Sequence, residues 1–183
     1  MTDFNFKKIS TVDVNACVDI IKSFTEEDWN RFTYRQNTWE VHQYTKTIPL
    51  LFDIDNMTKK IEDIKSVTAR LHYPKFKSLL ETVGSICKDV YGDGYLLRAI
   101  LTSLKSKHSI AKHKDESDNL EKCKRLHIAI LTDPECIFIV GGEAKYMRPG
   151  EMWEINNAGK AHSVHNKSNI DRVHLITDWV LYG

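Results

Sequence analysis

The sequence predicts a mainly β fold in which helices pack outside a sandwich or barrel of short strands. Short runs rich in β-branched and aromatic residues follow one another after Gly94, and turn signals separate them. Amphipathic helix patterns precede Gly94. No repeat, low-complexity tract or linker divides the 183 residues, a length typical of one domain. We therefore expect one domain over 1–183, with helical and strand support over about 1–93 and a β core over about 94–183.

Two helices are expected in the supporting part. Ser10 and Thr11 offer side-chain oxygens that can cap the first helix. Its apolar residues recur at helical spacing, at Val14, Cys17, Val18 and Ile21. The second helix is expected from about Lys75 to Tyr91 and ends at Gly92-Asp93-Gly94. Its apolar stripe consists of Phe76, Leu79, Leu80, Val83, Ile86, Cys87 and Val90.

Strands are expected on both sides of the second helix. One runs from about Val41 to Phe52, where Pro49 indicates an edge or a bulge because proline has no N–H to donate. The core strands are expected at Tyr95–Leu104, Arg125–Leu131, Cys136–Val140, Met152–Ile155, Ala161–Asn166 and Arg172–Leu181. Turn signals such as Asp133-Pro134, Gly141-Gly142 and Pro149-Gly150 separate them.

Composition narrows the classes of partner. Hydrophobic residues make up 42% and charged residues 28%, as in globular proteins. Lys plus Arg is 26 and Asp plus Glu is 25, so no overall charge favours nucleic acid or a membrane surface as a partner. No stretch approaches the ~18 apolar residues of a membrane span, and the N-terminus lacks a signal peptide's apolar stretch. Four cysteines without a CxxC pair favour a reduced, cytoplasmic protein, although two disulfides are arithmetically possible.

A metal site is indicated by His113-Lys114-Asp115. In an extended segment residues i and i+2 project to the same side, so His113 and Asp115 can share one ion. A second histidine can come from His162 or His165 on another strand; because they are three apart they face opposite sides, and only one can be a ligand. Two histidines and one carboxylate leave open positions on an octahedral metal, the arrangement of non-haem Fe(II) oxygenases.

Five motifs follow one another in this half of the chain. They are Leu104 and Ile110 leading into His113-Lys114-Asp115, Arg125-Leu126-His127-Ile128-Ala129-Ile130, Pro149-Gly150-Glu151-Met152-Trp153-Glu154-Ile155, His162-Ser163-Val164-His165-Asn166 and Arg172-Val173-His174-Leu175-Ile176-Thr177-Asp178. In this order they resemble the aspartyl/asparaginyl β-hydroxylase family of Fe(II)- and 2-oxoglutarate-dependent oxygenases. The resemblance covers about Tyr95 to Trp179. A weaker similarity to the family is found upstream, at Trp29, Arg35-Gln36 and His42–Ile48.

The resemblance implies a double-stranded β-helix, the jelly-roll core also found in cupins. It also implies that His113, Asp115 and His162, rather than His165, are the catalytic iron ligands. Some family members lack the carboxylate ligand, whereas this chain has Asp115. The expected reaction uses O₂ and 2-oxoglutarate, hydroxylates an amino-acid residue, free or in a peptide or protein, and releases succinate and CO₂.

Four residues are candidates for binding 2-oxoglutarate. Arg172 matches the family's carboxylate-binding arginine, and its planar fork suits a carboxylate. Arg125 and His127 match family positions that also contact the co-substrate. Thr102 is a further candidate for a hydroxyl contact.

Other polar and aromatic residues have less specific interpretations. Trp29, Arg35, Trp39 and His42 could line a substrate pocket, but an aromatic packing layer is the favoured interpretation. The remaining histidines, His72, His108, His165 and His174, are expected to be structural or exposed. Two other functions stay open: a cupin-type module that binds a metal or small ligand and has no need of Arg172, and a catalytically inactive interaction protein.

Overall fold

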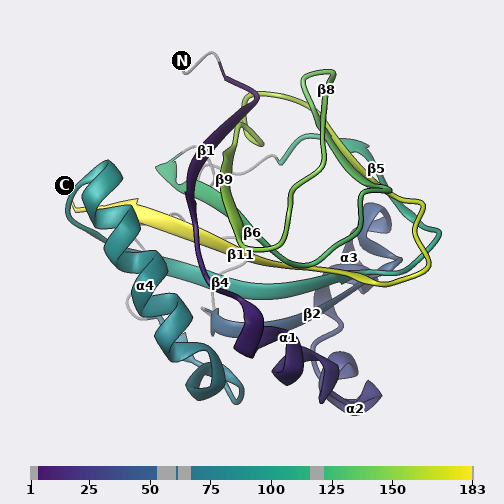
Figure 1. The fold of residues 1–183 in the computed structure, drawn as a ribbon, viewed down its shortest axis with the longest axis horizontal. Coiled ribbons are helices and arrows are strands. Elements are labelled where there is room, and N and C mark those ends of the chain that lie inside the picture. Colours follow the sequence, from purple (N-terminus) through teal and green to yellow (C-terminus); the bar gives the residue numbers. More distant parts are fainter. Residues whose placement is uncertain (1–3, 53–60, 62–66, 116–121, 183) are drawn as a thin grey trace.

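Two antiparallel sheets form the centre of the molecule. The computed structural model describes residues 4–52, 61, 67–115 and 122–182 (Figure 1). The strands are β1 (Phe6–Thr11), β2 (Thr45–Phe52), β3 (Thr68–Ala69), β4 (Gly94–Leu104), β5 (Ser109–His113), β6 (Lys124–Leu131), β7 (Cys136–Val140), β8 (Glu143–Lys145), β9 (Glu151–Ile155), β10 (His162–Asn166) and β11 (Arg172–Leu181). The large sheet has the order β1-β9-β6-β11-β4-β2-β3, and the small sheet β5-β10-β7-β8.

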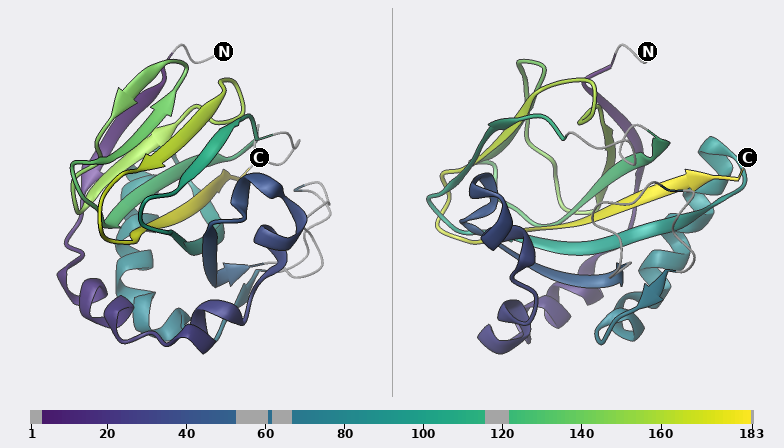
Figure 2. Two further views of the ribbon diagram at one scale, coloured as in Figure 1. Left: turned by 90° about the vertical axis from the view of Figure 1, so that its right-hand side faces the viewer. Right: turned by 180° about the vertical axis from the view of Figure 1, so that it is seen from behind.

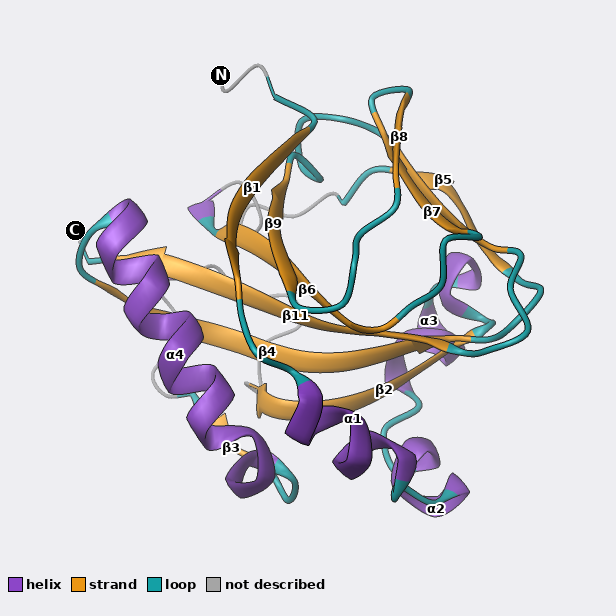
Figure 3. Ribbon diagram, viewed as in Figure 1, coloured by secondary structure: helices purple, strands orange, loops and turns teal. Residues whose placement is uncertain are grey.

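The helices lie outside this pair of sheets. They are α1 (Asn15–Lys22), α2 (Glu26–Asn30), α3 (Tyr34–Thr38), the short 3₁₀ helix η1 (Glu40–His42) and α4 (Tyr73–Tyr91). Helix α4 packs on β4, β2 and β11, and α1 contacts β6, so both cover the outer face of the large sheet (Figures 2 and 3). Helix α3 and η1 contact β2, and η1 contacts β5, at the other end of the large sheet. This is the expected mainly β jelly roll with flanking helices.

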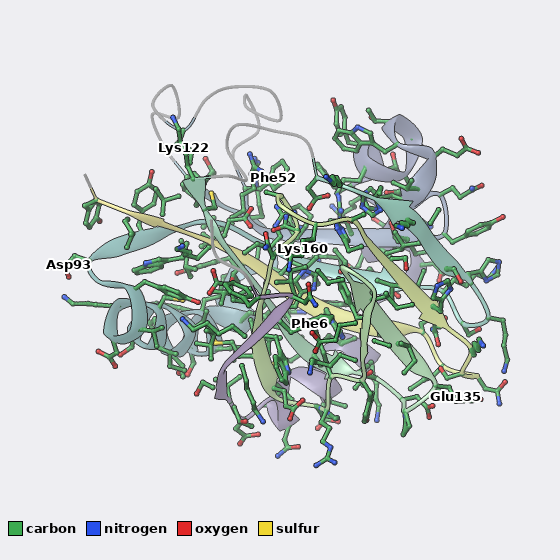
Figure 4. All side chains as sticks on the ribbon, turned by 90° about the horizontal axis from the view of Figure 1, so that it is seen from above. Phe6, Phe52, Asp93, Lys122, Glu135 and Lys160 are labelled. Carbon is green, nitrogen blue, oxygen red and sulfur yellow. The ribbon has the colours of Figure 1, made fainter. Side chains whose placement is uncertain are left out.

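Strand β11 is buried on both faces and divides the interior into two layers. Val173, Leu175 and Trp179 belong to the larger apolar core between the large sheet and the helices. Because side chains alternate along a strand, Arg172 and Asp178 point the other way, toward the space between the two sheets. The inward face of the large sheet is therefore partly polar. Figure 4 draws the side chains on the ribbon, seen from above.

The strands expected after Gly94 are all present, with bounds that differ by at most one residue. Strands β5 and β8 were not among those expected. The register of β2 with β4 shifts between Pro49 and Leu51, which confirms a bulge at Pro49. The expected strand from Val41 begins only at Thr45, because η1 occupies the preceding residues.

The expected start of the first helix is wrong. Ser10 and Thr11 lie at the end of β1, where they pair with β9. Helix α1 begins at Asn15, whose backbone N–H donates to the Asp13 carboxylate over 2.9 Å. The second helix is confirmed as α4, which starts two residues earlier than expected, with a proline in its first turn. Among the described residues, no helix is long and apolar enough to span a membrane.

Candidate active site

The two candidate histidine ligands lie side by side on neighbouring strands. His113 ends β5 and His162 begins β10, and the antiparallel register pairs them directly. Their ring centroids are 4.2 Å apart. Asp115 follows β5 by two residues, and one ligand atom from each of His113, Asp115 and His162 lies within 4.8 Å of the others. The structure thus brings the whole predicted triad together.

The two oxygens of Asp115 have different surroundings. Oδ1 faces the histidines, 3.5 Å from Nε2 of His113 and 3.9 Å from Nε2 of His162. Oδ2 accepts hydrogen bonds from Arg125 Nη1 over 2.8 Å and from Asn157 Nδ2 over 2.6 Å. One oxygen is held by the protein, and the other is free to bind a metal between the histidines.

The orientation of His113 suits the same arrangement. Its Nδ1 lies 2.8 Å from the carbonyl oxygen of Ala111, and because a carbonyl only accepts, Nδ1 is the donor. Nε2 then carries the lone pair that a metal needs. His165 lies on the other face of β10, with its Nδ1 3.0 Å from Ser109 Oγ, and is not part of the cluster.

The electrostatics of Asp115 and His162 favour the protonation states of metal ligands. Burial would lower the pKa of His113, but its hydrogen bonds to Asp115 and to the carbonyl of Ala111 raise that pKa above its usual value. Burial alone would raise the pKa of Asp115, but His113, Arg125 and His162 outweigh burial and hold the pKa well below its usual range. Burial lowers the pKa of His162 to about 4, an effect that Asp115 opposes and His113 reinforces. Near neutral pH the site therefore offers an ionised carboxylate and a neutral His162, as metal binding requires.

All four co-substrate candidates line a cavity next to the triad, and three of them are buried with unsatisfied polar atoms. Arg172, Thr102 and His127 share this cavity with His113, Asp115 and His162. Among the described residues, no hydrogen-bond partner is found for Nε and Nη1 of Arg172, Oγ1 of Thr102 or Nδ1 of His127. Burial lowers the pKa of Arg172 to about 10, so its guanidinium remains charged at neutral pH. A buried cation without a counter-ion fits the far carboxylate of 2-oxoglutarate.

The fourth candidate, Arg125, lines the same cavity, but its guanidinium already has hydrogen-bond partners. Its Nε and Nη2 donate to both carboxylate oxygens of Asp178, over 2.8 and 2.9 Å, and its Nη1 donates to Asp115. These bonds commit the guanidinium to the carboxylates of Asp178 and Asp115. Sequence reasoning did not identify Asp178 or Asn157 as part of the site, although Asp178 ends the motif that begins at Arg172.

A histidine that was expected to be structural or exposed is also notable. His174 is 2% exposed, and neither ring nitrogen has a hydrogen-bond partner among the described residues. It pairs with Thr102 across the sheet, and its ring lies 5.8 Å from that of His127. The interior beside Arg172 therefore holds further unsatisfied polar groups.

A larger cavity of about 570 Å³ adjoins the first, and Arg35, His42, His113 and Asp115 line both. Arg35, Trp39 and His42 line it, whereas Trp29 is buried in the core on the helix side of the large sheet. The packing interpretation therefore fits Trp29, and the pocket interpretation fits the other three. Phe52, labelled in Figure 4, lines the same cavity from β2.

Comparisons with known proteins identify the family of the chain. The family model described as aspartyl/asparaginyl beta-hydroxylase matches residues 19–180. A search of curated protein sequences finds no match.

Several solved structures share the fold. An oxidoreductase of the 2OG-Fe(II) oxygenase family from Burkholderia pseudomallei is 13% identical, with a TM-score of 0.58 over 76% of this chain and 67% of that chain. A viral collagen prolyl hydroxylase from Paramecium Bursaria Chlorella virus-1 is 9% identical, with a TM-score of 0.56 over 99% and 98%. A prolyl-4-hydroxylase from Pseudomonas putida is 8% identical, with a TM-score of 0.54 over 99% and 95%. At these identities the likeness concerns the fold.

The family model spans most of the chain, from the helices that cover the large sheet to the end of β11. The chain therefore belongs to the aspartyl/asparaginyl β-hydroxylase family of Fe(II)- and 2-oxoglutarate-dependent oxygenases.

Proposed function

We propose that His113, Asp115 and His162 hold Fe(II), and that Arg172 pairs with the far carboxylate of 2-oxoglutarate. The observation that carries this proposal is the meeting, in one cavity, of a two-histidine, one-carboxylate cluster and a buried arginine without a counter-ion. A metal-binding module of cupin type has no need of such an arginine. Thr102 and His127 line the cavity between these groups and supply further polar contacts.

Fe(II), 2-oxoglutarate and O₂ together supply the oxidising power that hydroxylates a C–H bond while succinate and CO₂ are released. The chain orients the reactants and limits access of water. Three residues fix the metal, and Arg172 sets the direction in which the co-substrate enters. Arg125 and Asn157 keep one oxygen of Asp115 occupied, so that the other stays directed at the metal position.

The proposed substrate is an amino-acid residue, free or within a peptide or protein. The family and two similar structures described as prolyl hydroxylases support this class. We propose that residues 1–183 act as one oxygenase domain, since strands β1 and β2 of the first half belong to the same sheet as β4, β6 and β11.

An anaerobic titration with Fe(II) and 2-oxoglutarate tests the proposal. Wild-type protein should develop the weak visible absorption band of a keto acid chelated to iron, only when both are added. His113→Ala should lose the band and all iron-dependent turnover. Arg172→Ala should need a much higher 2-oxoglutarate concentration. A folded, iron-loaded protein without the band would contradict the proposal and favour the cupin-type binding module.

A further inference from the structure

Arg35 is a cation in the 570 Å³ cavity that has no acidic partner. It lies on α3 and shares the cavity with His113 and Asp115. Its Nη2 lies 3.1 Å from Nε2 of His42. No carboxylate among the described residues forms an ion pair with Arg35, whereas Arg125 engages both oxygens of Asp178. A guanidinium is strongly stabilised by a carboxylate. Arg35 can therefore form an ion pair with a carboxylate of a bound ligand.

His42 fixes the direction of that guanidinium. A guanidinium only donates, so Nε2 of His42 accepts the hydrogen bond and the imidazole is neutral at this nitrogen. The His42 ring also stands edge-on to the His113 ring, at 5.7 Å and 89°. Arg35 is thereby positioned within reach of the metal ligands but makes no bond to them among the described residues.

The charge on Arg35 persists at neutral pH. Burial and the neighbouring Arg125 lower its pKa to about 10, and Asp115 and Asp178 partly offset them. The cavity is lined by four cations, Arg35, Arg98, Lys114 and Arg125, and by three carboxylates, Glu40, Asp115 and Asp178. Since Asp115 is a proposed metal ligand, the pocket favours a negatively charged guest.

An apolar wall lines the same cavity. Phe52, Ile100 and Ile176 form one cluster, and all three line the cavity, together with Val41 and Trp39. A guest therefore meets a cation, an aliphatic and aromatic surface, and the metal ligands His113 and Asp115. An aliphatic amino acid presents matching groups: a carboxylate and, a few bonds away, unactivated C–H bonds on an apolar side chain.

We propose that Arg35 binds the carboxylate of the substrate, that His42 positions Arg35, and that the substrate is an aliphatic amino acid with a free α-carboxylate. This inference rests on the proposed function and specifies its substrate. The carboxylate pairs with the fork of Arg35, and the side chain lies on the wall of Phe52, Ile100 and Ile176, beside the iron position.

Measurements of succinate release test whether the bound carboxylate is the α-carboxylate of a free amino acid. Three groups of compounds are compared: aliphatic amino acids, their primary carboxamides, and capped peptides with one acidic residue. Free acids should stimulate the wild-type protein, and carboxamides should be weaker by about 10- to 100-fold in kcat/KM, the usual effect of losing a charged hydrogen bond. Arg35→Gln should lose a similar factor for the acid and little for the amide. Arg35→Lys should fall between, because it keeps the charge but not the fork.

Matched variants separate binding from folding. Arg31→Gln removes an exposed arginine of the neighbouring segment and should behave as wild type. His42→Gln keeps an acceptor for Arg35 and should raise KM for the acid less than His42→Leu does. Thermal unfolding and the 2-oxoglutarate band of each variant show that the fold and the co-substrate site are intact.

Each contrary result has its own meaning. Amides or capped acidic peptides that work as well as free acids would overturn the α-carboxylate assignment. If Arg35→Gln weakens the 2-oxoglutarate band but not the stimulation of succinate release by the free amino acid, Arg35 belongs to the co-substrate site. A wild-type protein that shows the band but binds no aliphatic amino acid would also overturn the inference, whereas a missing band would contradict the proposed function itself.

Discussion

Asp115 illustrates how a single residue combines a structural and a chemical task. Its Oδ2 is held by Arg125 and Asn157, and its Oδ1 faces the two histidines. The sequence motif indicated Asp115 and the resemblance indicated Arg125, but the ion pairs of Arg125 with Asp115 and Asp178 were not predicted. Asp178 comes from β11, directly opposite Arg125 in the sheet register, and such a pairing is fixed only by the fold.

Asp178→Asn should weaken both stability and metal binding. Asp178 is 1% exposed and neutralises the buried Arg125, so its loss leaves a buried charge poorly paired, at a cost of about 3–5 kcal/mol. Metal affinity should fall roughly 10- to 100-fold because Asp115 loses its fixed partner. Urea unfolding and Co(II) titration measure the two effects, and the exposed Asp89→Asn serves as control. Unchanged stability and affinity would refute this role.

Arg172→Met should have opposite effects on the free and the ligand-bound protein. Nε and Nη1 of Arg172 are buried without hydrogen bonds among the described residues, so an apolar side chain of similar length should leave the apoprotein equally stable or more stable. The rise in Tm on addition of 2-oxoglutarate with Zn(II) should disappear. Arg148→Met, at an exposed position, should keep that rise. A large fall in apoprotein Tm would indicate a structural role instead.

At the scale of the elements, the long buried strands and helix α4 were predictable, whereas β1 and α3 were not. Strands β4, β6 and β11 carry long runs of buried apolar residues, a strong local signal. Strand β1 is mostly exposed or half-buried and is held by its pairing with β9. Helix α3 has only five residues and none is buried, so no periodicity revealed the element that carries Arg35. Such segments depend on tertiary contacts.

Two glycines test the packing of β4 and α4. A Cβ on Gly94 would lie 2.2 Å from the backbone oxygen of Val180, so Gly94→Ala must push β4 away from β11. The expected loss is about 1–3 kcal/mol of unfolding free energy. A Cβ on Gly84 would lie 3.9 Å from Trp179, an ordinary contact, and alanine favours a helix by about 1 kcal/mol. Urea unfolding should therefore move in opposite directions for Gly94→Ala and Gly84→Ala; a shift of the same sign would contradict the packing described.

At the scale of the whole molecule, the fold separates stability from function. The larger apolar core lies between the large sheet and the helices, while the space between the sheets holds the polar groups of the site. The sequence indicated a supporting half and a core half, yet β1 and β2 join the sheet that carries Arg172. Hydrophobic patterns predicted the sandwich, but the large cavity beside Arg35 arises from contacts between distant segments and had no local signal.

The polar interior makes the metal-free protein sensitive to acid. Burial lowers the pKa of His42 to about 3 and that of His162 to about 4, and it holds those of His127 and His174 well below the usual value. A histidine with a lowered folded-state pKa binds its proton more readily when unfolded. Unfolding free energy should therefore fall as pH drops from about 6.5 toward 4, and rise again on neutralisation.

Urea titrations of metal-free protein between pH 7 and pH 4.5 measure this dependence. The slope against pH should correspond to more than one proton taken up on unfolding, and His174→Gln should reduce it by about one proton. His165→Gln provides the comparison, since His165 is only half-buried, on the face of β10 that points away from the site. A stability that is flat over this range would contradict the burial of neutral histidines.

The most direct test of the central claim is anomalous diffraction at the iron edge from anaerobic crystals grown with Fe(II) and 2-oxoglutarate. One strong peak should lie between His113, Asp115 and His162, with the far carboxylate of the keto acid paired to Arg172. Iron bound elsewhere, or a co-substrate whose far carboxylate avoids Arg172, would contradict the proposed site.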